Sequence, residues 1–142
     1  MIYRSLKVQP VIQGDSLLVD IQNVGNVDLE LLMLDVYVPE TVSQGNKFGA
    51  GIGVTMHQAL RDGIVYRDYA CCSVRGAFDN IVPILRPIVT PSMGPIRPSI
   101  EIPIRTGLSE EHNGLSIYIQ VHAIGYRTLE ERFRISEIPS WS

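Results

Sequence analysis

The sequence predicts an all-β sandwich, and its first forty residues carry the clearest signals. In the run 17–21, one side carries Leu17, Val19 and Ile21, while Asp20 and the following Gln22 lie on the other. This period of two is typical of a half-buried strand. A second apolar run covers residues 29–38. The segment 23–26 between them, Asn-Val-Gly-Asn, predicts a turn because asparagine and glycine tolerate positive φ.

Further strands are expected along most of the chain. The segments that alternate, or that are rich in strand-forming residues, are 5–12, 64–74, 100–105, 117–123 and 129–135. Pro10 cannot donate a ladder hydrogen bond, so it suits an edge strand. In the run 29–38 the parity of the polar residues changes between Glu30 and Asp35. This change predicts either a β-bulge within residues 31–34 or burial on both faces there.

The middle of the chain is less regular. Residues 41–48 are polar and predict a loop. In residues 49–53 the glycine spacing is not that of a dinucleotide-binding loop and no strand precedes it, so a surface loop is expected. Residues 55–62 are expected to form two turns of helix, with Thr55 as the N-cap and Gly63 just past the end. The same residues also fit a strand and a turn.

Residues 81–103 hold six of the nine prolines of the chain. Proline at this density excludes helix and central-strand pairing, so the backbone should be extended. The segment is nevertheless too apolar for a free linker. It is expected either to pack along the edge of the sandwich or to offer apolar surface to a partner, with Arg86, Met93 and Arg97 as candidate interface residues.

Length and charge limit the class of protein. Residues 1–142 are expected to form one domain, because this length can bury a sizeable core. A formal charge of −3 argues against nucleic acid as the main partner. No run approaches the roughly 20 apolar residues that a membrane-spanning helix needs, so no membrane partner is expected. Residues 1–7 lack a signal-peptide core, so a cytoplasmic location is expected.

Residues with reactive side chains do not form a recognisable catalytic or metal-binding motif. Cys71 and Cys72 are adjacent, so on a strand they point to opposite faces and cannot form an unstrained disulfide. His57, His112 and His122 show no metal-ligand spacing. We therefore expect no catalytic residue, no metal and no cofactor.

An outward row on the predicted strand 117–123 is a second candidate interface. Tyr118, Gln120 and His122 alternate with the apolar residues of this strand and should face solvent together. An exposed tyrosine row can anchor a protein partner, although a single outward tyrosine more often only covers its neighbours.

Two parts of the chain resemble bacterial immunoglobulin-like domains. Residues 18–29, continuing to Pro39, are similar to strands B and C of those domains, and residues 116–135 look like their F–G hairpin. Ile117 departs from the pattern, since a corner tyrosine is expected there. The resemblance implies an immunoglobulin-like sandwich of seven to nine strands with an elaborated middle segment. It also implies that residues 23–26 cross between two sheets, and it implies a binding role.

The expected function is accordingly a non-catalytic protein-interaction module that self-associates as a homo-oligomer or joins an assembly. One alternative is a structural subunit of a particle, such as a phage or secretion component. A further alternative is a small enzyme or metal-binding protein that uses Cys71 or Cys72 with a histidine.

Overall fold

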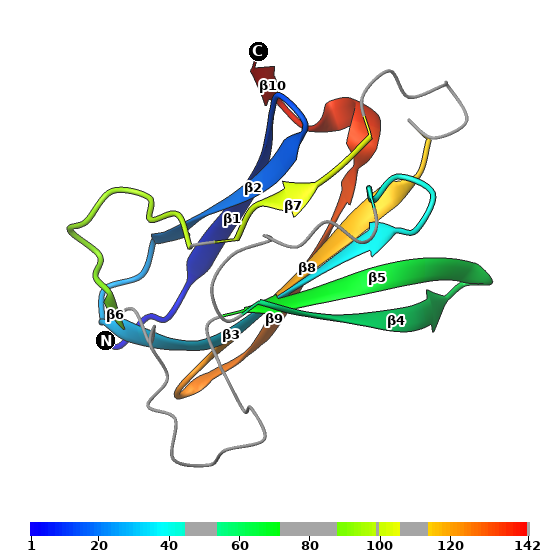
Figure 1. Cartoon of the computed structure of the whole chain (residues 1–142). Helices are drawn as coiled ribbons and strands as arrows, with labels where there is room; N and C mark the ends of the chain where they lie inside the picture. Colours follow the sequence, from blue (N-terminus) through cyan, green and yellow to red (C-terminus); the bar gives the residue numbers. More distant parts are fainter. Residues whose placement is uncertain (45–53, 72–87, 99, 106–113, 142) are drawn as a thin grey trace.

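The computed structural model describes residues 1–44, 54–71, 88–98, 100–105 and 114–141. These residues form two sheets that face each other across one core (Figure 1). Strand pairing is antiparallel except between the first and last strands, which run parallel over two residue pairs. The prediction of an all-β sandwich is confirmed at this level. Within the described residues, no helix is long and apolar enough to span a membrane.

The smaller sheet has the strand order β10-β1-β2-β7. Its strands are β1 (Leu6–Gln13), β2 (Ser16–Asn23), β7 (Ile102–Pro103) and β10 (Ser140–Trp141). The larger sheet has the order β4-β5-β3-β8-β9, and β6 also pairs with β3. Its strands are β3 (Leu29–Pro39), β4 (Thr55–Arg61), β5 (Ile64–Cys71), β6 (Ile88–Val89), β8 (Ser116–Ala123) and β9 (Tyr126–Arg134). A short 3-10 helix, η1 (Ile135–Glu137), follows β9.

The core lies between the sheets and takes alternate side chains from β1, β2, β3, β5 and β8. The residues with no exposed surface are Val19, Ile21, Val36, Val38, Val89, Ile100, Ile102, Ile119 and Val121. Fully burying one such side chain stabilises the fold by about 1.5–3 kcal/mol. Because the inward positions are filled this way, the polar positions of the same strands form the outer face of each sheet.

The turn predicted at residues 23–26 carries the chain from one sheet to the other, as the resemblance to immunoglobulin-like domains implied. β2 belongs to the smaller sheet and β3 to the larger one. Asn23 is 2% exposed, and its Nδ2 donates to the carbonyls of Val27 (2.7 Å) and Val89 (2.9 Å). A Cβ at Gly25 would collide with the Tyr3 carbonyl oxygen, so the N-terminal segment can lie against this turn only because position 25 is glycine.

The predicted bulge in the second apolar run is confirmed. The register of β3 against β8 shifts between Leu31 and Met33. The extra residue moves the next polar position to the opposite parity, so Asp35 faces the outer side of the sheet while Leu34 and Val36 remain in the core.

The predicted helix at residues 55–62 is wrong, and the alternative of a strand and a turn is correct. β4 pairs with β5 along its whole length, from Thr55 opposite Ala70 to Arg61 opposite Ile64. Asp62 and Gly63 form the two-residue turn, with φ of 52° and 76°. Asp-Gly is a preferred sequence for such a tight hairpin turn. Gly63 therefore closes a hairpin rather than ending a helix.

The described part of the proline-rich segment packs along both sheets. β6 pairs with β3, β7 pairs with β2, and Ile96 exchanges backbone hydrogen bonds with Ile21 of β2. Val89, Ile100 and Ile102 are fully buried, whereas Ile88 and Met93 are 56% and 39% exposed. Of the two predictions for this segment, packing along the sandwich fits most of its described apolar residues. Residues 81–87, with Arg86, lie outside the described residues.

Candidate functional site

The predicted interface residues lie on two different surfaces. Tyr118, Gln120 and His122 share the outer face of the larger sheet, on β8. Arg97 lies on the outer face of the smaller sheet, where it pairs with Asp20 of β2. Met93 lies in the turn after β6. Because the core separates the two outer faces, these residues do not form one continuous interface.

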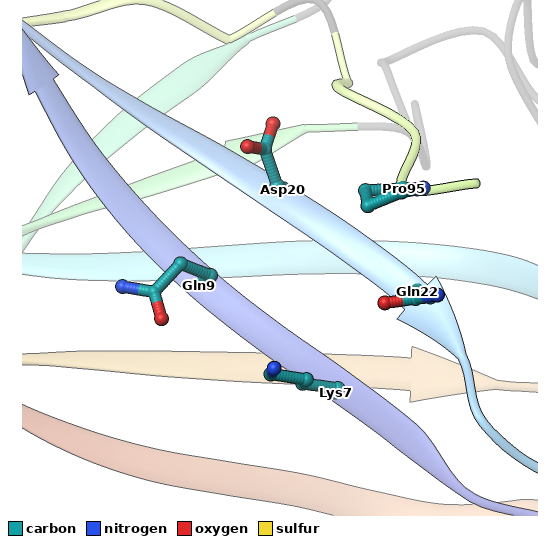
Figure 2. Close-up of a pocket in the computed structure, with 5 residues that line it drawn as sticks. All are labelled: Lys7, Gln9, Asp20, Gln22 and Pro95. Atoms are coloured by element: carbon teal, nitrogen blue, oxygen red, sulfur yellow. The ribbon is translucent and has the colours of Figure 1, made fainter.

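A hollow lies next to Arg97 on the outer face of the smaller sheet. The Nε and Nη2 atoms of Arg97 donate to Oδ1 and Oδ2 of Asp20 at 2.7 and 3.1 Å, so the two side chains form a bidentate pair. The hollow of about 170 Å³ lies beside this pair, and Figure 2 shows the residues that line it: Lys7, Gln9, Asp20, Gln22 and Pro95. An exposed ion pair of this kind contributes little to stability. The Arg97 charge is already matched within the chain.

Two carboxyl groups meet on the outer face of the larger sheet. Asp35 of β3 and Asp68 of β5 are hydrogen-bonded to each other. Burial raises the pKa of both groups, and burial together with the hydrogen bond and the charge of Asp35 raises the pKa of Asp68 to about 7. Two carboxylates this close cannot both ionise easily, so the pair holds a shared proton below neutral pH. Oδ1 of Asp68 is buried and has no hydrogen-bond partner among the described residues.

His122 extends this network toward β9. Its Nε2 lies 3.1 Å from Oδ2 of Asp35, and its Nδ1 lies 3.0 Å from Oγ1 of Thr128. Burial lowers the pKa of His122, which favours the neutral ring. A neutral ring with the proton on Nε2 donates to Asp35 and accepts from the threonine hydroxyl.

The order carboxylate, imidazole and hydroxyl is the one that activates a nucleophile in many hydrolases. In those sites the carboxylate stays charged and stabilises the imidazolium. Here the carboxylate of Asp35 also accepts the hydrogen bond of the protonated Asp68, so its charge is divided between Asp68 and His122. The geometry therefore supports a network that links β5, β3, β8 and β9 rather than a base for Thr128.

Arg61 binds two tyrosines and a glutamate on the same face. Its guanidinium lies 3.9 Å from the ring centre of Tyr118 and 5.0 Å from that of Tyr37. Its Nη1 is 2.7 Å from Oε1 of Glu130. Arg61 is on β4 and Glu130 is on β9, and these are the first and last strands in the order β4-β5-β3-β8-β9. Since neighbouring strands are about 4.8 Å apart, this contact requires the sheet to coil strongly.

The side chains of the predicted outward row, Tyr118, Gln120 and His122, have their polar or aromatic groups in contact with other side chains on this face. Tyr118 stacks under Arg61, and Nε2 of Gln120 donates to Glu130 at 3.1 Å. His122 is bonded on both ring nitrogens. All three side chains are half-buried. Their polar groups are therefore matched within the sheet, which makes them poor anchors for a partner.

β4 is one edge of the larger sheet, and most of its residues are exposed. The described residues place β5 on one side of it and no strand on the other. Met56 is 41% exposed and Leu60 is 72% exposed, and Val65 opposite Leu60 is 41% exposed. Arg61 is the one Lys, Arg, Asp or Glu in the strand. In β9, the edge strand on the other side of this sheet, charges are frequent (YRTLEERFR).

The backbone of β4 presents alternate residues to the open edge. In a hairpin closed by a two-residue turn, the flanking pair, here Arg61 and Ile64, is hydrogen-bonded and the pairs then alternate. The carbonyl of Val65 accepts at 2.9 Å from the N–H of Glu40, the residue after β3, so the backbone groups of Val65 face the β3 side rather than Leu60 of β4. The N–H and C=O groups of Met56, Gln58 and Leu60 therefore point away from β5.

The cysteine and histidine candidates for metal binding or catalysis do not come together. Cys71 is 2% exposed and belongs to the core, whereas His57 faces the outer side of the sheet opposite Asp68. In the part of the chain that the structure describes, no three His, Cys, Asp or Glu residues could hold a metal ion. Cys72, His112 and the glycines of residues 49–53 lie outside the described residues.

Comparison with protein-family models, with curated proteins and with solved structures finds no match to this chain. The class that the fold defines is a two-sheet, all-β protein. The features of this structure that bear on function are the exposed strand β4 and the polar network beside it. Sequence reasoning placed β4 only as the alternative to a helix, although the Asp62-Gly63 pair was a signal for a hairpin.

Proposed function

We propose that this protein is a non-catalytic interaction module, and that it binds by accepting a strand of another polypeptide chain at β4. One observation carries the proposal: β4 is a long, exposed edge strand with almost no charge. Its outward N–H and C=O groups form a ready template for a further strand.

The other edges of the two sheets are less suited to this role. β7 and β10, which end the smaller sheet, are each two residues long. β9 carries charged side chains over much of its length, a common way of preventing unwanted pairing. Only β4 among the described edges combines length, exposure and low charge.

The polar network supports the proposal because it holds the β4–β5 hairpin in place. Arg61 at the tip of β4 stacks on Tyr118 and pairs with Glu130, and Tyr66 of β5 packs edge-on against Tyr118 at 5.7 Å between ring centres. A strand that is fixed before binding loses less conformational entropy when a partner adds to it. In this interpretation Tyr118 positions the binding edge instead of contacting the partner.

Burial of Cys71 in the core supports a non-catalytic role over an enzyme or metal site built on that thiol. A thiol that acts as a nucleophile or a ligand is usually accessible and lies near a base or another ligand. The histidines at positions 57 and 122 lie on the opposite side of the sheet from Cys71.

Proline at position 58 tests the proposal. Gln58→Pro removes an outward N–H that the β4–β5 ladder does not use, whereas the control Gln58→Thr keeps this N–H. With each variant as bait in extracts of the native cell, mass spectrometry should find partner chains with wild type and Gln58→Thr, and at least tenfold less with Gln58→Pro. Equal capture by both variants, with both folded by circular dichroism, would contradict the proposal.

A further inference from the structure

The sequence of β4 is complementary to itself when two copies run antiparallel. From this, and resting on the proposed function, we infer that the strand added to β4 is β4 of a second copy of this chain. The two copies are related by a twofold axis that passes beside Gln58, and their larger sheets join into one continuous sheet. Such an interface is isologous, because the same surface is used by both copies.

The outward groups of β4 restrict the possible registers. Met56, Gln58 and Leu60 point to the open edge, so each must lie opposite an outward residue of the second copy. The register that uses the whole strand places Gln58 opposite Gln58 and Met56 opposite Leu60. These are the hydrogen-bonded pairs, and the residues between them are the pairs without hydrogen bonds.

The side chains favour the same register. Met56 and Leu60, both exposed in the single chain, form two equivalent apolar pairs across the axis. Val65, opposite Leu60 in the hairpin, adds to the same apolar surface. On the other face Arg61 lies opposite Thr55, so no two like charges meet.

Registers shifted by two residues lose these advantages. One shift places His57 opposite His57, and Leu60 then has no residue of the second β4 opposite it. The opposite shift leaves Met56 without one and places His57 opposite Arg61. The register centred on Gln58 is therefore the one in which both apolar side chains are paired.

Charged substitutions of Gln58, which lies beside the proposed twofold axis, test the inference. Gln58→Lys and Gln58→Glu each place two like charges opposite one another in the pair, but add one exposed charge to the single chain. Size-exclusion chromatography with light scattering should give twice the 15.8 kDa chain mass for wild type. For each variant alone, the dissociation constant of the pair should be about tenfold higher than for wild type. A 1:1 mixture of the two variants should recover the pair, because lysine then lies opposite glutamate. Gln13→Lys, an exposed glutamine of β1, is the control and should behave as wild type.

The outcomes separate the inference from the proposed function. A wild-type chain that stays at 15.8 kDa up to millimolar concentration overturns the inference, while β4-dependent capture of a different protein would still support strand addition. A wild-type pair that both Gln58 variants form equally well also overturns the inference. Loss of the pair in each variant, with recovery in the mixture, supports it, since that pattern requires position 58 to face itself.

Discussion

His122 Nε2 lies 3.1 Å from Asp35 Oδ2, and this contact ties β8 to β3 on the outer face of the larger sheet. Asp35 in turn shares a hydrogen bond with Asp68 on β5, and Asp68 lies opposite His57 of the edge strand β4. A row of polar side chains therefore runs from the middle of the sheet to the strand that we propose as the binding edge. The protonation of Asp68 should affect the stability of this region.

Asp68→Asn should remove a pH dependence of stability. The pKa of Asp68 is raised in the folded state to about 7 from 3.8, so the folded chain holds a proton that the unfolded chain releases between these values. Its contribution to stability is full below pH 3.8 and is lost as pH rises through 7. The amide cannot ionise, so the variant should be about as stable as wild type at pH 5 and roughly 1–2 kcal/mol more stable at pH 8, a figure reduced for solvent exposure.

Urea unfolding at pH 5 and pH 8 measures this difference. Asp28→Asn, which removes an exposed carboxylate from the turn before β3, is the control and should leave the pH dependence of wild type unchanged. If Asp68→Asn and wild type lose the same stability between the two pH values, Asp68 is not the group responsible.

Gly25→Ala should destabilise the crossing between the sheets. The new Cβ would meet the Tyr3 carbonyl and would lie 2.9 Å from the Ser5 nitrogen, and backbone atoms cannot move aside as a flexible side chain can. We expect a loss of roughly 1–3 kcal/mol in thermal or urea unfolding. Gly94→Ala is the matched control, because nothing lies within 4 Å of its Cβ position, and its effect should stay within about 0.5 kcal/mol. Equal effects of the two substitutions would show that the N-terminal segment does not pack on this turn.

Arg61→Ala should loosen the β4–β5 hairpin. The substitution removes the contact with the Tyr118 ring and the ion pair with Glu130, which together should cost roughly 1 kcal/mol. Hydrogen exchange should become faster in the amides of β4 and β5 that face each other. Arg61→Lys keeps the charge but lacks the planar guanidinium, so it should fall between wild type and alanine. Unchanged exchange in Arg61→Ala would mean that the turn alone holds the hairpin.

Met93→Glu distinguishes the proline-rich segment from β4 as the interface. Met93 is 39% exposed and lies outside the larger sheet, so we expect the charged variant to self-associate and to capture partners as wild type does. Its thermal midpoint should also stay within a few degrees of wild type. Light scattering and the capture experiment measure both. A variant that folds normally but no longer associates would place the interface on the turn after β6 and not on β4.

Local patterns predicted much of the fold. The alternation in residues 17–21, the turn at residues 23–26 and the parity change before Asp35 each have a local cause in strand geometry. The hairpin of β8 and β9 follows from the same alternation. These features depend on neighbours in sequence, so a single chain is enough to predict them.

The site depended on contacts that the sequence does not display. Asp35 and His122 are 87 residues apart, and only the pairing of β3 with β8 brings them together. Residues 55–61 are short and mixed in polarity, so helix and strand periods fit almost equally well, and the Asp-Gly turn decided the outcome.

Amide hydrogen exchange of β4, resolved residue by residue by NMR, tests the central claim most directly. In the separated chain the amides of His57 and Ala59 should be protected by β5, while those of Met56, Gln58 and Leu60 should exchange freely. On association, at high concentration or with a captured partner, we expect exchange at Met56, Gln58 and Leu60 to slow at least tenfold. Free exchange at these three amides in the associated state would contradict strand addition at β4.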